Sequence, residues 1–133
     1  MEQGLTHIYC GDGKGKTTAS VGLAVRAAGQ GLRVVYVQFF KDGTSGEFQV
    51  LRELDNVRLL PPEKKFGFIW TLSEEERQEA KSFYTEHFRQ AAALAKDADL
   101  LVLDEIISAC NCGTVPEEEV IAFLRARPVG LEV

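Results

Sequence analysis

Short apolar runs alternate with amphipathic stretches along most of the chain, and this pattern predicts strands that alternate with helices. The strands are expected at residues 5–10, 33–40, 57–60 and 99–105. The run RVVYVQFF at residues 33–40 is almost continuously apolar, which is typical of a parallel strand covered on both faces. Strands that alternate with helices through short turns favour βαβ units and a mostly parallel sheet.

The amphipathic stretches predict helices at residues 17–28, 47–54, 73–96 and 116–127. The first of them is broadly apolar and should pack against the sheet. The third is the clearest, because Ser73 and Glu76 form a capping box at its start. Its inner face is expected to hold Phe83, Phe88, Ala91, Ala92 and Ala95. Pro61 and Pro62 end the preceding strand, and residues 63–72 show no period, which predicts a loop with exposed aromatic rings.

Composition narrows the class of protein. With 133 residues, 45% of them hydrophobic and 26% charged, the chain is expected to form one globular domain over residues 1–133. A formal charge of −5 argues against binding to a nucleic-acid backbone as the main function. We see no apolar run near the roughly 20 residues that span a bilayer, no leader, and an odd number of cysteines. We therefore expect a cytoplasmic protein that binds neither nucleic acid nor membrane.

A glycine-rich turn, GDGKGKTT, lies between the first expected strand and the first expected helix, which is the setting of a P-loop. Its backbone N–H groups can surround phosphate oxygens, Lys16 adds a full charge, and Thr17 can ligate Mg²⁺. The strict pattern has glycine where this chain has Cys10, and a turn that merely connects two elements is the alternative. The candidate nucleotide-binding residues are Gly11, Asp12, Gly13, Lys14, Gly15, Lys16, Thr17 and Thr18.

Two carboxylates, Asp104 and Glu105, end the last expected strand. Ligands of open parallel sheets bind beyond the carboxyl ends of the strands, so both groups should face the same crevice as the P-loop. One of them can hold Mg²⁺, directly or through water, together with Thr17. The alternative is a charged strand end that pairs with a nearby lysine or arginine.

A P-loop followed by an Asp-Glu pair favours ATP hydrolysis, with Glu105 positioning water on the γ-phosphorus. A nucleotide-binding module without catalysis is a further interpretation. Neither explains the aromatic rings between Phe66 and Trp70, which are costly to expose without a function. The alternative is that these rings cover the sheet edge or join the core.

Five segments together resemble one family. They are GDGKGKTT at residues 11–18, VQFFK at 37–41, FGFIWT at 66–71, VLDE at 102–105 and ARP at 126–128. Their order and spacing are similar to those of ATP:corrinoid adenosyltransferases of the CobA/BtuR type, through nearly the whole chain. The resemblance implies an α/β P-loop NTPase fold of the RecA-like class, with a mostly parallel sheet flanked by helices. It also implies truncation at the C-terminus, because the family continues past ARP into a strand that residues 131–133 only begin.

The resemblance further implies a reaction. Such enzymes transfer the 5′-deoxyadenosyl group of ATP to the Co(I) of a reduced corrinoid and release triphosphate, in vitamin B12 coenzyme synthesis or salvage. Lys16 and Glu105 would be the catalytic residues. Thr17, with Asp104 or Glu105, would hold Mg²⁺ beside the triphosphate.

The corrinoid side of the site is implied in the same way. Phe68 and Trp70 match aromatic residues that pack at the corrinoid face and exclude its lower axial ligand, which brings Co(I) within reach of a biological reductant. Gln38 and Lys41 would contact the nucleotide or the corrinoid. The implied partners are ATP, a corrinoid and a cobalt reductant such as a flavoprotein, and the resemblance leaves a homodimer open.

Overall fold

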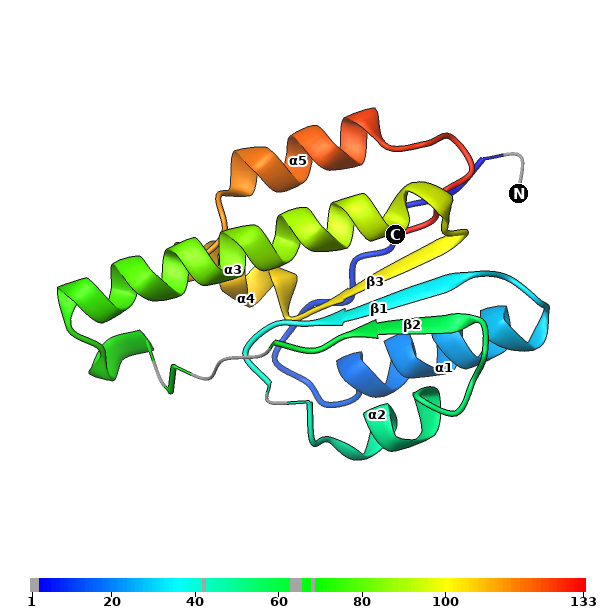
Figure 1. Ribbon diagram of the computed structural model, residues 1–133, viewed down its shortest axis with the longest axis horizontal. Coiled ribbons are helices and arrows are strands. Elements are labelled where there is room, and N and C mark those ends of the chain that lie inside the picture. The colour runs from blue at the N-terminus through cyan, green and yellow to red at the C-terminus, as the bar shows by residue number, and fades with distance from the viewer. Residues whose placement is uncertain (1–2, 42, 63–65, 68) are drawn as a thin grey trace.

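A parallel sheet lies between two layers of helices in the computed structural model, which describes residues 3–41, 43–62, 66–67 and 69–133 (Figure 1). The strands are β1 (Val34–Gln38), β2 (Val57–Leu60) and β3 (Leu100–Asp104), in the order β2-β1-β3. β1 pairs in parallel with both of its neighbours. The predicted α/β class with a mostly parallel sheet is therefore confirmed, and the arrangement is that of a P-loop NTPase-like fold.

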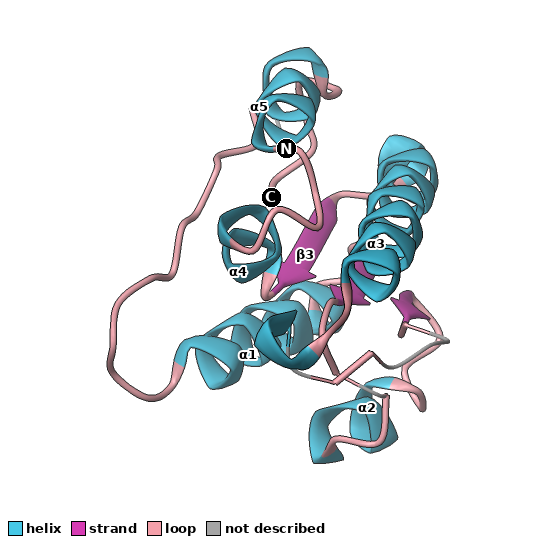
Figure 2. Ribbon diagram, turned by 90° about the vertical axis from the view of Figure 1, so that its left-hand side faces the viewer, coloured by secondary structure: helices cyan, strands magenta, loops and turns pink. Residues whose placement is uncertain are grey.

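Helices cover both faces of the sheet, as the two views at right angles agree (Figures 1 and 2). One face carries α1 (Lys16–Gly29) and α2 (Gly46–Leu51), and the other carries α3 (Glu74–Leu94), α4 (Ile106–Asn111) and α5 (Glu117–Ala126). The 3₁₀ helices η1 (Ile69–Thr71) and η2 (Ala95–Asp97) flank α3. Within the described residues, no helix combines the length and the apolar character that crossing a membrane requires.

The predicted helices are confirmed to within a few residues, but α4 was not predicted. It has six residues, too few to show a helical period in the sequence. Its N-cap residue, Glu105, makes no side-chain cap hydrogen bond, so the usual signal of a helix start is also missing. Glu105 had been expected to end the strand, but β3 stops one residue earlier, at Asp104.

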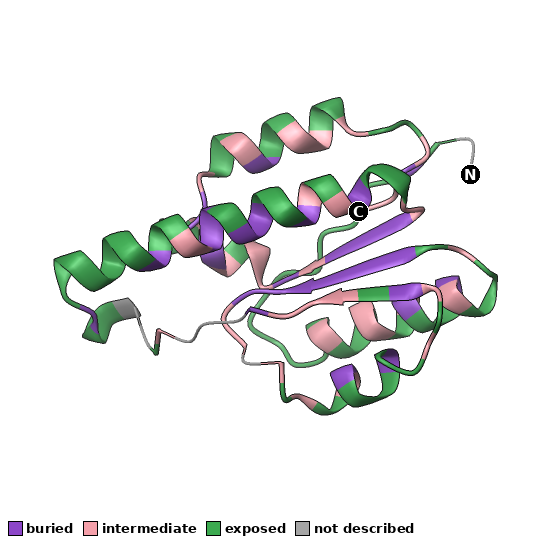
Figure 3. Ribbon diagram, viewed as in Figure 1, coloured by how far each residue is buried: buried purple, intermediate pink, exposed green. Residues whose placement is uncertain are grey.

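The strand β1 has a hydrophobic core on each of its faces, because successive side chains of a strand point to opposite sides. Val35 and Val37 pack in the core beneath α3, whereas Val34 and Tyr36 pack in the core with α1 and α2. All of the strand is buried (Figure 3). The continuous apolar run in the sequence thus reflects burial from both sides.

The longest helix, α3, begins as predicted. The Ser73 hydroxyl accepts from the Glu76 backbone N–H and the Glu76 carboxylate accepts from the Ser73 N–H, each at 3.2 Å. The bond from the Ser73 backbone holds the pKa of the Glu76 carboxyl below its usual value. Of the expected inner face, Phe88, Ala91 and Ala95 are buried and Phe83 and Ala92 are half-buried. Tyr84 and His87, which the prediction did not name, are also buried.

The prediction of a strand at residues 5–10 is wrong, because no regular strand forms there. The segment's described backbone–backbone hydrogen bonds lie near its start: the His7 N–H donates to the Val133 carbonyl at 2.7 Å, and the Val133 N–H donates to the Leu5 carbonyl at 3.0 Å. Within the described residues no further ladder continues along residues 8–10. The expected start of a strand at residues 131–133 is confirmed as a single parallel bridge between Glu132 and Leu100.

The last carbonyl of β1, that of Gln38, cannot be satisfied by β2. The Val34 N–H donates to the Asn56 carbonyl at 2.9 Å, so the backbone N–H and C=O groups of the even-numbered residues of β1 point toward β2. By this alternation the donor for Gln38 would be residue 62, which is Pro62 and has no N–H. His87 of α3 supplies the bond instead, with Nε2 at 2.8 Å from the Gln38 carbonyl oxygen. Because a carbonyl only accepts, Nε2 carries the proton and donates it.

Replacing His87 with alanine should lower the free energy of unfolding by about 2–4 kcal/mol, since it orphans a buried carbonyl and empties the space of the ring. That ring packs against Phe39 at 5.0 Å and Phe83 at 5.9 Å between centroids. Urea unfolding measures the change. Gln90→Ala, on an exposed position of the same helix, should change stability by less than about 0.5 kcal/mol. Equal midpoints for the two variants would contradict this role of His87.

Candidate functional site

The candidate site lies where the carboxyl ends of β1 and β3 meet the start of α1. Gln38 and Asp104, the last residues of the two strands, are partners in the sheet register. Thr17 is the second residue of α1. Chain segments far apart in sequence therefore converge at one edge of the sheet, as expected for ligand sites in open parallel sheets.

The glycine-rich loop before α1 is open to solvent, and residues 11–16 are all exposed. Gly11 and Gly15 have φ angles of 121° and 104°, in the left-handed region that favours glycine. Gly15 is also the N-cap of α1, which has no side-chain cap and no acidic residue in its first turn. The first N–H groups of the helix are thus left for an anionic ligand.

The ammonium group of Lys16 is positioned at this loop by two hydrogen bonds. Its Nζ donates to the carbonyl oxygens of Gly11 at 2.8 Å and Gly13 at 2.6 Å. Both bonds lie in an exposed setting. Phosphate oxygens can therefore replace these carbonyls as acceptors without burial of an uncompensated charge.

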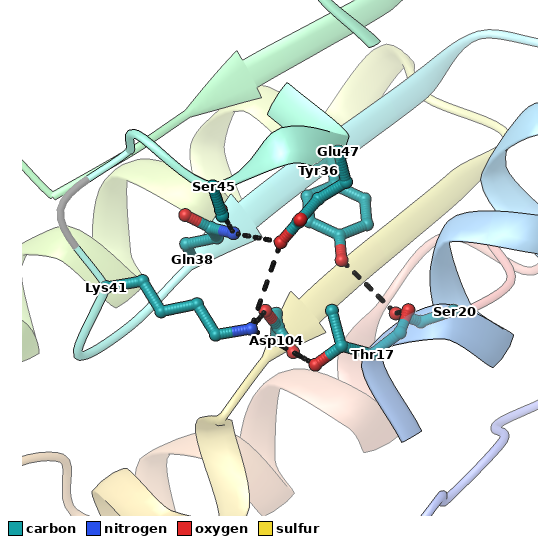
Figure 4. A network of polar contacts seen from close by, with 8 residues as sticks. All are labelled: Thr17, Ser20, Tyr36, Gln38, Lys41, Ser45, Glu47 and Asp104. Atoms are coloured by element: carbon teal, nitrogen blue, oxygen red, sulfur yellow. Dashed lines mark hydrogen bonds and ion pairs between the residues drawn. The ribbon is translucent and has the colours of Figure 1, made fainter. Parts of the chain in front are cut away.

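A second cluster joins the three segments through side chains (Figure 4). Thr17 Oγ1 donates to Asp104 Oδ1 at 3.1 Å. Lys41 Nζ donates to Thr17 Oγ1 at 3.1 Å and to Asp104 Oδ2 at 2.7 Å, and lies 3.9 Å from Glu47 Oε1. We call Thr17, Lys41 and Asp104 the edge cluster. It brings together three residues that the sequence named as candidates, and Glu47 is one that it did not name.

Left-handed residues follow both strands at this edge. Phe40 has a φ of 65° and Glu105 a φ of 72°, a conformation that costs about 1 kcal/mol or more outside glycine. The ring of Phe40 packs at 5.0 Å on that of Tyr84, which stabilises the turn leading to Lys41. Burial raises the pKa of Tyr84, and a hydrogen bond with the Phe40 backbone opposes that rise. The sequence carries no signal for either turn.

The first turn of α1 is tied to β1 through Ser20. Its hydroxyl donates to the Thr17 carbonyl at 2.8 Å and lies 3.2 Å from the Tyr36 hydroxyl. Because the Ser20 proton is already used, Tyr36 is the donor to Ser20. Burial raises the pKa of Tyr36, so the phenol keeps the proton that this bond needs. The link holds the first turn of α1, which carries Thr17, against β1, the neighbour of the strand that ends at Asp104.

Gln38 is fully buried and turned into the protein. Its Nε2 donates to Ser45 Oγ at 3.1 Å and to Glu47 Oε1 at 3.0 Å. Its Oε1 is buried without a hydrogen-bond partner in the described part of the chain. A contact between Gln38 and a ligand stays a prediction.

The oxygens of the edge cluster fit Mg²⁺ in kind. Mg²⁺ is bound through one or two carboxylates together with substrate phosphates, and the Thr17 hydroxyl and Asp104 carboxylate are hard oxygen donors of this type. Across residues 3–41, 43–62, 66–67 and 69–133 no group of three or more His, Cys, Asp or Glu forms a cage. Such an ion would therefore depend on a ligand's phosphates. Of the two candidate carboxylates, Asp104 contacts Thr17, whereas Glu105 is half-buried at the start of α4.

The aromatic segment divides between the two explanations that the sequence left open. Phe66 joins the core, with ring centroids 5.7 Å from Phe83 and 5.8 Å from Tyr84. Trp70, in η1, is 74% exposed. Phe68 lies outside the described residues. One ring is therefore structural, and the other offers an apolar surface.

Comparison with known proteins finds the same family in a family model and in individual relatives. The family model of the ATP:corrinoid adenosyltransferases BtuR/CobO/CobP matches residues 2–133. A corrinoid adenosyltransferase of Pseudomonas aeruginosa is 34% identical over 135 residues, covering 96% of this chain and 63% of that protein. The corrinoid adenosyltransferase CobA of Salmonella typhimurium is 34% identical over 127 residues, covering 96% and 64%. The chain thus spans slightly less than two thirds of the length of these curated relatives.

Proposed function

Because the chain belongs to the ATP:corrinoid adenosyltransferase BtuR/CobO/CobP family, we propose that it transfers the 5′-deoxyadenosyl group of ATP to the Co(I) of a reduced corrinoid. The electron pair of Co(I) forms the Co–C5′ bond, the C5′–O bond breaks, and triphosphate leaves with that bonding pair. The observation that supports this most directly is the contact of Thr17 with Asp104 beside an open, uncapped loop. In the proposal, this contact joins the loop that would hold the phosphates to the carboxylate that would bind the cation.

In this reaction the nucleophile belongs to the substrate, so the protein needs no Ser, Cys or His nucleophile. Its residues bind and orient the nucleotide and stabilise the negative charge that develops on the departing triphosphate. We assign this work to Lys16 and the N-terminus of α1. Thr17 and Asp104 would hold Mg²⁺, which supplies further charge neutralisation when bound. Glu105 is kept as the second candidate carboxylate.

The exposed ring of Trp70 is the proposed contact with the corrinoid, with Phe68 as its neighbour in sequence. An aromatic ring packed on the corrinoid face would exclude the lower axial ligand and ease reduction of Co(II). Gln38 and Lys41, at and just beyond the end of β1, are the proposed contacts nearer the nucleotide. A cobalt reductant such as a flavoprotein, a homodimer and a cytoplasmic location remain predictions.

A product assay separates the candidate functions. The protein is incubated with ATP, Mg²⁺ and chemically reduced corrinoid, and the Co–C bond is followed by absorbance, alongside triphosphate and orthophosphate. Co–C bond formation with equimolar triphosphate is the expected result. Orthophosphate from ATP alone, without a Co–C bond, would favour the hydrolase with Glu105 positioning water. Tight ATP binding with neither product would favour a binding module.

Replacing Trp70 with alanine should reduce adenosylation that starts from Co(II) and a reductant by about tenfold, the equivalent of one good aromatic contact. Adenosylation that starts from pre-formed Co(I) should fall much less, because the ring is assigned to the reduction step. The ratio of the two rates measures the effect, with Trp70→Phe as the control that keeps an aromatic ring. Equal losses from both starting states would contradict the axial-ligand role.

A further inference from the structure

A lysine occupies the position between the oxygens assigned to the divalent cation. Lys41 Nζ donates to Thr17 Oγ1 at 3.1 Å and to Asp104 Oδ2 at 2.7 Å (Figure 4). Thr17 Oγ1 donates its own proton to the other carboxylate oxygen, at 3.1 Å. The lone pairs that would bind a cation are therefore directed at an ammonium group.

The charge balance of the site requires a cation at this place. The Asp104 side chain is only 7% exposed, and a buried carboxylate without a partner is strongly unfavourable. Glu47 brings a second carboxylate to 3.9 Å from the same ammonium. Lys41 supplies the compensating charge from the chain itself.

We propose that Lys41 is the resident cation of this site: it keeps free divalent cations out while no nucleotide is bound, and exchanges with the cation that arrives with the triphosphate. The proposal rests on the proposed function, because it uses the Thr17–Asp104 site assigned there. An ammonium and a dication on the same two oxygens repel each other strongly. The Lys41 side chain is unbranched and 29% exposed, so its ammonium can turn from Asp104 to a phosphate oxygen.

The exchange explains why the Thr17–Asp104 site needs no full set of protein ligands for a divalent cation. Without nucleotide the ammonium satisfies both oxygens. With nucleotide, the triphosphate supplies ligands for the divalent cation and a new partner for Lys41. Binding of the metal is thereby made conditional on the nucleotide.

The test measures Mn²⁺ binding to the nucleotide-free protein, through the electron paramagnetic resonance signal of free Mn²⁺. Wild type, Lys41→Met and the double variant Lys41→Met/Asp104→Asn are compared. Lys41→Met should gain one Mn²⁺ site at least about tenfold tighter than any in wild type. The double variant should lose that site again. Lys81→Met, which removes an exposed lysine of α3, should leave Mn²⁺ binding as in wild type.

Thermal unfolding provides a second measurement. Mn²⁺ should raise the melting temperature of Lys41→Met and leave that of wild type almost unchanged, because a ligand stabilises the folded state that binds it. If Lys41→Met does not fold, Lys41→Gln keeps hydrogen-bond donors without the charge and should show the same Mn²⁺ dependence. Equal Mn²⁺ affinities in wild type and in the Lys41 variant would overturn the proposal, as would a gained site that persists in the double variant.

The outcomes are independent of catalysis. If the wild-type protein forms no Co–C bond but its Lys41 variant gains the Mn²⁺ site, the exchange at Lys41 is supported and the proposed function is contradicted. If the wild-type protein is an active adenosyltransferase but its Lys41 variant gains no Mn²⁺ site, the proposed function is supported and the exchange is contradicted.

Discussion

Lys16→Ala should lower kcat/KM for ATP in adenosyl transfer by about 10²–10³-fold, the loss typical of removing one preorganised charge-stabilising donor. Lys16 holds its ammonium at the loop through two carbonyls, where a triphosphate would meet it. The departing triphosphate carries more negative charge than the ground state, so the loss should fall on kcat as well as on KM. Co–C bond formation at varied ATP concentration measures both.

The fold should tolerate this change, because Lys16 is exposed and, in the described part of the chain, its ammonium bonds only to carbonyls of its own loop. Urea unfolding should shift by less than about 0.5 kcal/mol. Lys81→Ala, which removes an equivalent charge on the outer face of α3, is the matched control and should keep full activity. Activity of Lys16→Ala within a few-fold of wild type would show that the loop does not hold the triphosphate.

Asp104→Asn should reduce adenosyl transfer by about 100-fold or more, since a neutral amide is a poor ligand for a divalent cation. Its Oδ1 and Oδ2 atoms receive hydrogen bonds from Thr17 and Lys41. In the variant, the NH₂ group of the amide faces the donor of either Thr17 or Lys41, so one hydrogen bond is lost. The free energy of unfolding should therefore also fall by about 1–3 kcal/mol. Activity against Mg²⁺ concentration is the decisive measurement, and the variant should need much more Mg²⁺.

Two controls sharpen the assignment of the carboxylate. Asp97→Asn makes the same chemical change at an exposed position of η2 and should leave the Mg²⁺ dependence unaltered. Glu105→Gln should affect Mg²⁺ dependence less than Asp104→Asn, because Glu105 starts α4 whereas Asp104 contacts Thr17. An unchanged Mg²⁺ requirement in Asp104→Asn, with a raised one in Glu105→Gln, would transfer the metal role to Glu105.

Most of the fold could be predicted because its signals are local. β1 and β3 are apolar runs, and α3 begins at a capping box that four consecutive residues encode. The errors occur where pairing depends on distant partners. Residues 5–10 have a strand-like composition, yet their described backbone–backbone hydrogen bonds reach only from Leu5 and His7 to Val133. Composition indicates that a segment can pair, and only the neighbouring chain decides whether it does.

The candidate site divides in the same way. The glycine-rich loop, Lys16, Thr17 and Asp104 could be named from the sequence, because a phosphate cradle needs particular residue types at fixed spacing. The role of His87 could not, since it depends on Pro62 lacking an N–H at one position in the register. Glu47 could not be named either, because α2 brings it to the strand end.

By itself the sequence determined the fold class, the glycine-rich loop before α1 and the resemblance to corrinoid adenosyltransferases, all of which rest on residue type and short-range order. The tertiary structure alone decided which groups face each other at the sheet edge. The left-handed conformation of Phe40 brings Lys41 into contact with Thr17 and Asp104. In the same structure Gln38 is buried and Trp70 is exposed. The physical reason is that the charge balance of a site depends on distances between side chains that lie up to 87 residues apart in the sequence.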